Sequence, residues 1–461
     1  MKSCDIALYG LGVMGSSLAK NMIGHGFRVA AYSKSEEERR RFALPGSESG
    51  YVVCADVQEL LASLKRPRIV FMMVTAGAAV DSVIGELLPY LERDDVLIDG
   101  GNSHFRDTAR RCEHLEDRGI RFLGVGVSGG EKGALLGPSL MVGGSRDGWM
   151  CCRRILETIA AHCGEETCCA YIAAQGAGHY VKMVHNGIEY AILELIAETY
   201  HLMRYGLKFT HKETTDTFRE WQSSRLDSYL MDISVRVLEK MDDDGTPLVE
   251  KILDVAEQKG TGRWTLQDAV ERGVYIPTIF EAVFARCVSS GKAVRVEGKR
   301  SLSATTAPFI MENSREKLRD ALLLGMILSY AQGMALIAKA SEENGWDIDP
   351  VKLVGVWRAG CIIWSELLTE VRTALSEEKA NLILTDTFSG VAALEPALRE
   401  TVTGAQRAAI AIPALTSALN YYDSFRMEQM PVNFVQALRD CFGAHTYRRV
   451  DKEGYFHTEW E

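Results

Sequence analysis

Five polar side chains share one face of a predicted helix near the middle of the chain. The helical positions i, i+3, i+4, i+7 and i+8 are occupied by Lys182, His185, Asn186, Glu189 and Tyr190, so the five stack over two turns. The residues that follow are nearly all apolar, which predicts a buried helix whose polar face meets polar partners. A base, an acid, an amide and two rings in one place are suited to proton transfer. The alternative is a set of hydrogen-bonded core residues without chemistry.

A glycine-rich turn near the N-terminus indicates a dinucleotide site. A short apolar strand, 5–9, leads into Gly10-Leu-Gly-Val-Met-Gly15, and residues 16–23 have a helical pattern. This is G-x-G-x-x-G between a strand and a helix. We expect Gly10 to permit the tight turn, Gly12 to let the backbone approach a pyrophosphate, and Gly15 to let the helix pack on the strand. The helix N-terminus offers its free N–H groups to the phosphates.

The end of the second predicted strand bears on the choice between NAD and NADP. An NAD site normally places Asp or Glu there to bond the ribose 2′-hydroxyl, but this chain has Ser33, Lys34 and Ser35. Two hydroxyls and a cation suit a 2′-phosphate, so the sequence favours NADP. The glutamates at 36–38 oppose this preference and the arginines at 39–41 compensate. The alternative is an exposed charged turn without a ligand.

Further loops follow predicted strands, where the ligands of parallel sheets bind. They are 75–77 and the segment around Asn102, which is either a ligand contact or a turn residue. After the next strand, Ser128, Gly129 and Gly130 can form a concavity of backbone N–H groups that suits a carboxylate. The alternation of strands and helices predicts a doubly wound α/β, Rossmann-like domain over residues 1–175.

From residue 176 the pattern changes to long helical periods, which predicts an all-α domain over 176–442 and a tail over 443–461. Residues 295–307 are expected to form a surface loop. The turn at 258–264 presents Lys259 and Thr261 before a helix, which suits an anion.

Three more residues add polar groups to this region. Arg286 stands inside an apolar helix, with a snorkelling surface role as the alternative. Arg439 and His445 flank a glycine turn near the end of the chain. With Lys182 and Lys259, these arginines would make a cationic pocket for a small, multiply anionic substrate.

Composition limits the classes of protein. The chain has 461 residues, 47% hydrophobic and 25% charged, and a formal charge of -10, which argues against nucleic-acid binding. The first residues carry no signal-peptide pattern, and no uninterrupted apolar run is long enough to span a membrane, so we expect a cytoplasmic protein. Eleven cysteines suit free thiols in a reducing compartment. A metal bound by the cysteines between 151 and 169 is disfavoured, because no C-x2-C pair is present.

Several long motifs resemble the 6-phosphogluconate dehydrogenase (decarboxylating) family of the β-hydroxyacid dehydrogenase superfamily, over essentially the whole chain. The motifs are Gly10–Gly15, Ile98–Ser103, Gly126–Gly130, Gly178–Tyr190, Gln258–Gly262 and Phe442–Tyr447. The resemblance implies oxidation and decarboxylation of 6-phosphogluconate to ribulose 5-phosphate and CO2 with NADP+, in the oxidative pentose phosphate pathway and gluconate utilisation. It implies Lys182 as general base and then acid, Glu189 as acid, and no metal. The chemistry then needs a lowered pKa at Lys182 and a raised pKa at Glu189.

The resemblance also implies the binding residues and a homodimer. The cofactor residues would be Gly10, Leu11, Gly12, Val13, Met14, Gly15, Ser33, Lys34, Ser35, Val74, Thr75, Ala76 and Asn102. The sugar-acid end of the substrate would be held by Asn102, Ser128, Gly129, Gly130, His185 and Asn186. The phosphate end would be held by Tyr190, Lys259, Thr261, Arg286 and Arg439. His445, with Arg439, would reach the site of the partner subunit, which the tail embraces.

Two departures from the family pattern fall in the cofactor residues. The family usually has Asn-Arg-Thr where this chain has Ser33, Lys34 and Ser35, and often Lys where this chain has Thr75. Lys keeps the charge of Arg but loses its planar fork. The rivals are a short hydroxy-acid dehydrogenase, which generally lacks the second helical lobe and the His445 tail, and a non-catalytic dinucleotide sensor, which would lose Lys182 or Glu189.

Overall fold

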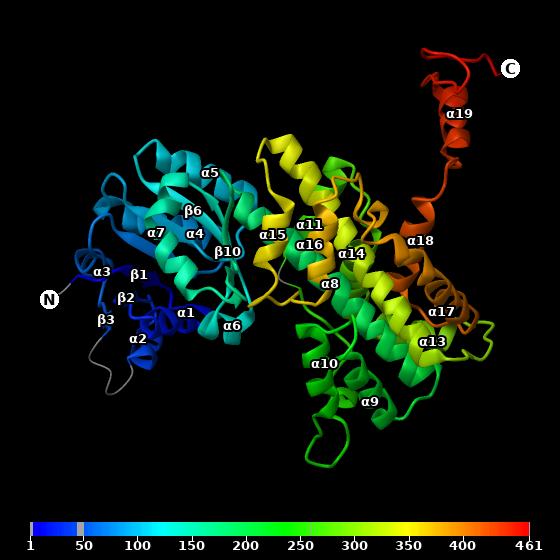
Figure 1. Cartoon of the computed structure of the whole chain (residues 1–461), viewed down its shortest axis with the longest axis horizontal. Helices are drawn as coiled ribbons and strands as arrows, with labels where there is room; N and C mark the ends of the chain where they lie inside the picture. Colours follow the sequence, from blue (N-terminus) through cyan, green and yellow to red (C-terminus); the bar gives the residue numbers. More distant parts are fainter. Residues whose placement is uncertain (1–2, 44–49, 259, 461) are drawn as a thin grey trace. The chain divides into compact units, whose positions relative to one another are not determined.

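An eight-stranded sheet forms the first part of the chain (Figure 1). The structure is a computed structural model that describes residues 3–43, 50–258 and 260–460. The strand order is β10-β7-β6-β5-β4-β1-β2-β3, and neighbours are parallel except β6 and β7. The strands are β1 (Ile6–Tyr9), β2 (Val29–Tyr32), β3 (Tyr51–Val53), β4 (Ile69–Met72), β5 (Val96–Asp99), β6 (Arg121–Ser128), β7 (Ser139–Gly144) and β10 (Cys169–Ala173). A two-stranded hairpin, β8 (His162–Cys163) and β9 (Glu166–Thr167), stands apart from it.

Helices cover both faces of this sheet, because its strands bury residues on both sides. In β1, Ile6 and Leu8 join one core while Ala7 and Tyr9 join the other. The first core lies under α1 (Val13–Gly24), α6 (Gly130–Leu136) and α7 (Arg146–Ile159), and the second under α3 (Val57–Ala62), α4 (Ala78–Leu87) and α5 (Phe105–Glu116). Helix α2 (Glu36–Phe42) follows β2. The predicted doubly wound α/β fold is confirmed.

The strand order changes direction at β1. Its two neighbours are β4 on one side and β2 on the other, so the chain leaves β1 and β4 toward opposite helical layers. A crevice between such loops is where open α/β sheets bind ligands. The loops in question are the glycine turn after β1 and the segment 73–77 after β4.

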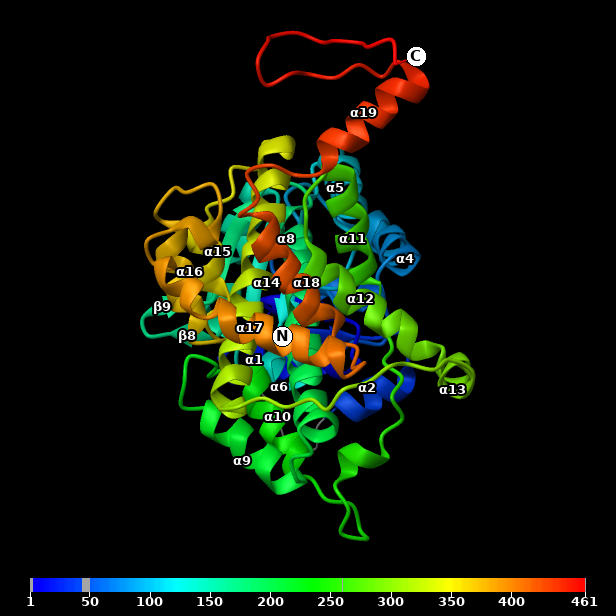
Figure 2. The same ribbon diagram turned by 90° about the vertical axis from the view of Figure 1, so that its right-hand side faces the viewer.

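Two long helices form the centre of the helical region, α8 (Ala177–His201) and α14 (Ser314–Asn344), which lie side by side (Figure 2). The others are α9 (His211–Trp221), α10 (Tyr229–Glu239), α11 (Thr261–Arg272), α12 (Pro277–Ser290), α13 (Lys292–Ser301), α15 (Pro350–Val356), α16 (Leu367–Leu375), α17 (Glu395–Arg407) and α18 (Pro413–Ser424). The predicted large helical region is confirmed. Among the described residues, α14 is the one helix long and apolar enough to cross a membrane, and 89% of its most apolar window is buried inside the protein.

One sequence expectation was wrong over half of its range. Residues 295–307 were expected to be a surface loop, and 302–307 are exposed and irregular, but Lys292–Ser301 forms α13, none of whose residues is buried. Val296 and Gly298 are poor helix formers, so local propensity alone does not predict a helix here. Contacts at its first turn hold it instead: Arg295 donates to the carbonyl of Ser289 at 2.9 Å and pairs with Asp254 at 2.7 Å.

Residues up to Leu419 form one compact unit, and those from Asn420 onward form a second. In the second unit, α19 (Val432–Gly443) is followed by a segment that folds back around Asp440. The carboxylate of Asp440 accepts hydrogen bonds from the backbone of Thr446 and Thr458 and from the indole of Trp460, at 2.9–3.0 Å. The domain limits at 175 and 442 stay predictions from the sequence pattern.

Candidate active site

Helix α8 carries the five polar side chains predicted to share a face. Lys182 and His185 are 6% and 0% exposed, and the side chain of Glu189 is 20% exposed. The stem of Lys182 lies directly on strand β6: a Cβ at Gly126 would lie 2.4 Å from the Cβ of Lys182. The glycine therefore allows a contact between helix and strand that no other residue would permit.

The imidazole of His185 joins the polar groups of this face. Its Nδ1 lies 3.2 Å from Nζ of Lys182 and 3.1 Å from Oδ1 of Asn186, and 3.8 Å from Oε2 of Glu189. Its Nε2 lies 3.1 Å from Oγ of Ser128. Because each ring nitrogen forms one good hydrogen bond at a time, Nδ1 either accepts from Lys182 or donates to one acceptor, the neutral amine of Lys182 or Oδ1 of Asn186. The proton position on this ring is therefore tied to that on Lys182.

Burial moves the three titratable groups of this face toward their neutral forms. It lowers the pKa of Lys182, and Glu189 and Cys361, in their ionised forms, would oppose that shift. Burial raises the pKa of Glu189, opposed by Lys182 and Arg286. Burial and the charge of Lys182 hold the pKa of His185 well below its usual value. The directions at Lys182 and Glu189 are those needed by the reaction that the family resemblance implies.

The sequence offered no sign of Cys361, which lies in the same cluster. Its buried thiol is 2.9 Å from Nε2 of His185 and 3.6 Å from Oγ of Ser128. The segment that carries it packs against the Ser-Gly-Gly turn, since a Cβ at Gly129 would lie 2.6 Å from the carbonyl of Gly360. Gly130, the next residue of the turn, is exposed and begins α6. A lone cysteine in a loop far along the chain has no spacing that links it to α8.

A second group of predicted residues gathers where α8 meets α11 and α12. The amide of Asn186 donates to Oγ1 of Thr261 at 3.3 Å. The guanidinium of Arg286 stacks 3.5 Å above the ring of Tyr190, so this Arg is more than a snorkelling surface residue. Lys259 lies outside the described residues.

The glycine turn after β1 has the shape that a dinucleotide needs. Gly10 has φ +101°, and a Cβ there would lie 2.4 Å from the carbonyl of Met73, while a Cβ at Gly15 would lie 1.9 Å from the carbonyl of Gly10. At Gly12 a Cβ would meet nothing nearer than Glu38, at 3.9 Å. No side chain caps the N-terminus of α1, so its first N–H groups are directed to the open side of the turn. The remaining turn residues are Leu11, which is buried, Val13, which is exposed, and Met14, which is half-buried.

The residues predicted to bind the 2′-phosphate have protein partners. The hydroxyl of Ser33 donates to Oε2 of Glu38 at 2.5 Å, and that of Ser35 accepts from the backbone N–H of Glu38 at 3.2 Å. Nζ of Lys34 pairs with Glu86 at 2.9 Å. Arg39 donates to the carbonyls of Ser33 and Lys34. The acids of this region therefore contact the groups on which the preference for NADP was based.

The loop after β5 is folded over a buried carboxylate. Asp99, fully buried, accepts from the backbone N–H of Gly101 at 3.0 Å and from the hydroxyl of Ser103 at 2.6 Å. Asn102 lies between these two and is exposed. The role of Asn102 as a ligand contact stays a prediction.

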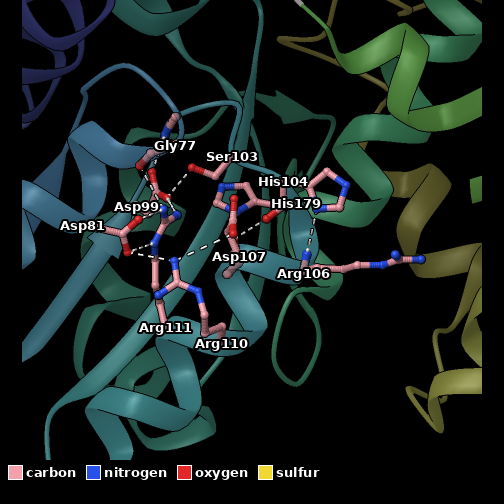
Figure 3. A network of polar contacts seen from close by, with 12 residues as sticks. Gly77, Asp81, Asp99, Ser103, His104, Arg106, Asp107, Arg110, Arg111 and His179 are labelled. Carbon is pink, nitrogen blue, oxygen red and sulfur yellow. Dashed lines mark hydrogen bonds and ion pairs between the residues drawn. The ribbon is translucent and has the colours of Figure 1, made fainter. Parts of the chain in front are cut away.

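A buried arginine joins that loop to the one after β4, as Figure 3 shows. Arg111 of α5 is 2% exposed and pairs with Asp81 at 2.8 Å and with Asp99 at 3.6 Å. It also donates to the carbonyl of Gly77 at 3.0 Å. Gly77 ends the segment of predicted cofactor residues after β4. In that segment Val74 and Ala76 are half-buried and Thr75 is exposed. One guanidinium thus links both loops expected at the cofactor.

Arg439 and His445 lie in the second compact unit, and both are exposed there. Arg439 donates to Oε1 of Gln436 at 3.0 Å, and His445 packs edge-on against Phe442. Within the described ranges, no three His, Cys, Asp or Glu side chains are placed to hold a metal ion. The eleven cysteines are free thiols.

Two family profiles together match nearly the whole chain. The "NAD binding domain of 6-phosphogluconate dehydrogenase" matches residues 5–173, and "6-phosphogluconate dehydrogenase, C-terminal domain" matches 178–460.

Proteins similar to this chain over their whole length are named 6-phosphogluconate dehydrogenase. The decarboxylating 6-phosphogluconate dehydrogenase of Lactococcus lactis subsp. lactis is 45% identical, covering 100% of this chain and 99% of that protein. The NADP(+)-dependent decarboxylating enzyme of Bacillus subtilis is 44% identical, over 100% of both chains. The solved 6-phosphogluconate dehydrogenase of Plasmodium falciparum, studied with NADP+ and with 6-phosphogluconate, is 38% identical with a TM-score of 0.95, covering 99% of this chain and 100% of that one. The chain therefore belongs to the 6-phosphogluconate dehydrogenase family.

Proposed function

We propose that this chain catalyses the oxidative decarboxylation of 6-phospho-D-gluconate to D-ribulose 5-phosphate and CO2, with reduction of NADP+ to NADPH. The names of its relatives support this activity. The observation that carries the proposal is the pair Lys182 and Glu189, a base and an acid on one buried helix face whose pKa values are displaced in the directions that the reaction needs. NADP+, when bound, accepts the hydride that leaves C3 of the substrate.

Lys182 begins the reaction as a neutral amine. Its lowered pKa supports this role, because an amine that is already protonated cannot accept the proton of the C3 hydroxyl. His185, 3.2 Å away, can donate to or accept from this nitrogen as its charge changes, which keeps the amine aimed along the helix face. Oxidation at C3 gives a β-keto acid, and the protonated Lys182 then polarises its carbonyl.

Glu189 completes the reaction as an acid. Cleavage of the bond between C1 and C2 releases CO2 and moves the electron pair toward the ketone oxygen, which takes the proton of Lys182, so that an enediol forms. The carbon that becomes C1 of the product must then gain a proton, which Glu189 delivers. The raised pKa of Glu189 supports this role, because burial favours the protonated form of the carboxyl.

Two groups of residues would hold the ends of the substrate. Asn102, Ser128, Gly129, Gly130, His185 and Asn186 would bind the sugar-acid end. Tyr190, Lys259, Thr261, Arg286 and Arg439 would bind the phosphate. The stacking of Arg286 on Tyr190 supports this second group, since the ring fixes the planar guanidinium, while its Nη1 donates to the carbonyl of Glu257 at 3.2 Å.

The chain would act as a cytoplasmic homodimer in the oxidative branch of the pentose phosphate pathway, with Arg439 and His445 reaching the partner's site. Helix α19 supports a partner, because its apolar side chains Phe434 and Phe442 are 67% and 74% exposed. Sedimentation velocity of the full chain tests this point, and a monomer at micromolar concentration would refute it.

The activity is tested by initial rates of NADPH formation from 6-phosphogluconate and NADP+, with CO2 measured in parallel. We expect one CO2 per NADPH. Glu189→Gln keeps the shape of the side chain but cannot donate a carboxyl proton, so it should lose about 100-fold or more. Glu316→Gln, on an exposed turn of α14, is the control and should keep its rate. Absence of turnover in the unmodified chain, or full activity of Glu189→Gln, would overturn the proposal.

A further inference from the structure

The carboxylate of Glu38 lies between the end of β2 and the glycine turn. It accepts the hydroxyl hydrogen bond of Ser33 at 2.5 Å, and its other oxygen is the nearest atom to the Cβ position of Gly12, at 3.9 Å. In dinucleotide sites an acid at the end of this strand bonds the ribose hydroxyls. Here the acid comes from the next helix, α2, five residues beyond Ser33. Its carboxylate nevertheless reaches the region where that acid normally lies.

The groups that would recognise a 2′-phosphate are bound elsewhere. The Ser33 hydroxyl donates its single proton to Glu38, and the Ser35 hydroxyl caps α2 by accepting from the N–H of Glu38. Lys34 pairs with Glu86. A phosphate that approached these hydroxyls would therefore meet the carboxylate of Glu38 first.

Arg39, beside Glu38 on α2, does not neutralise that carboxylate directly. Its Nη1 donates to the backbone carbonyl of Ser33, and its guanidinium stands 5.7 Å over the ring of Tyr32. Glu37, the preceding residue, pairs with Arg41 at 2.6 Å on the exposed side of the helix. Glu38 is thus the acid of this helix that contacts the predicted cofactor residues.

We propose that Glu38 determines the cofactor preference of this chain, by accepting hydrogen bonds from the ribose hydroxyls of NAD+ and repelling the 2′-phosphate of NADP+, so that both dinucleotides are used. This inference rests on the proposed function, because it assumes that a dinucleotide binds at the glycine turn. Like charges placed together at a binding site reduce affinity strongly. Removing the charge of Glu38 should therefore favour NADP+ over NAD+.

Calorimetric binding of NADP+ and NAD+ to the full chain tests this inference without turnover. Glu38→Gln should tighten NADP+ and weaken NAD+, changing the ratio of dissociation constants by about tenfold or more. Glu37→Gln removes the same charge one residue away and should change that ratio less than about twofold. The same ratio, taken from kcat/KM with 6-phosphogluconate, should change in the same direction.

An unchanged ratio in Glu38→Gln would overturn the inference, and so would an equal change in Glu37→Gln, which would show a general effect of net charge. These outcomes differ from failure of the proposed function. If the unmodified chain oxidises 6-phosphogluconate while the Glu38→Gln ratio is unchanged, only the role of Glu38 fails. If the chain binds both dinucleotides with the expected ratios but does not oxidise 6-phosphogluconate, the proposed reaction fails and the role of Glu38 stands.

Discussion

A single methyl group on strand β6 should displace Lys182. Gly126 lies under the stem of this lysine, where a Cβ would stand 2.4 Å from the Cβ of Lys182 and 3.0 Å from its Cγ. The carbonyl of Gly178, at 3.1 Å from the same position, limits movement along the helix. Both neighbours belong to α8, so Gly126→Ala must move the start of the helix away from the strand.

The size of the displacement follows from these distances. An ordinary carbon–carbon contact is about 3.5 Å or more, so the helix and strand must separate by about 1 Å. Misplacing a catalytic group by that much costs about 100-fold in rate. Inserting a methyl group into a packed core costs about 1–3 kcal/mol of unfolding free energy. We therefore expect a folded, less stable protein with kcat lowered by about 100-fold.

The assay compares kcat, substrate affinity and urea unfolding of Gly126→Ala with those of Gly85→Ala. Gly85 is exposed in α4, and a Cβ there meets nothing within 4 Å. The control should keep its kcat and gain up to about 1 kcal/mol of stability, because alanine favours a helix. Unchanged kcat in Gly126→Ala would refute the reasoning. A loss of kcat explained wholly by unfolded protein, with the folded fraction fully active, would refute it as well.

Two further predictions concern pH and the loops. Activity should fall at low pH as Lys182 gains its proton and at high pH as Glu189 loses its own, so the residual rate of Glu189→Gln should lack the alkaline limb. Its acid limb should stay in place, because in this scheme Glu189 still holds its proton where Lys182 titrates, and a retained alkaline limb would contradict the assignment. In Arg111→Lys the side chain lacks the planar guanidinium that donates to both Asp81 and Gly77. The free energy of unfolding, measured in urea, should fall by about 1.5–3 kcal/mol, and NADP+ should bind more weakly. Unchanged NADP+ affinity would show that the guanidinium does not position these loops.

Periodicity predicted the centre of the site well. On a helix the direction of each side chain follows from its position in the sequence, so the shared face of Lys182, His185 and Glu189 could be predicted from residue spacing alone. Their burial followed from the apolar residues around them. The required pKa directions then followed from burial, because a buried group favours its neutral form.

Contacts between distant segments could not be predicted in this way. Cys361 approaches His185 from 176 residues away, and Arg111 joins two loops through a geometry that only the folded sheet defines. Helix α13 was missed for a related reason, since the bonds that hold its first turn come from residues outside it.

The cofactor end shows where a sequence gives charges but not their partners. Lys34 and the neighbouring acids could be counted from the sequence, and the sum favoured a 2′-phosphate. The structure pairs Lys34 with Glu86, in a different helix, and brings Glu38 to Ser33. Exposed ion pairs are worth little, so a phosphate can draw Lys34 away from Glu86 at small cost. The half-buried carboxylate of Glu38, hydrogen-bonded to Ser33, is harder to move, and therefore the acid rather than the cation should decide which dinucleotide binds.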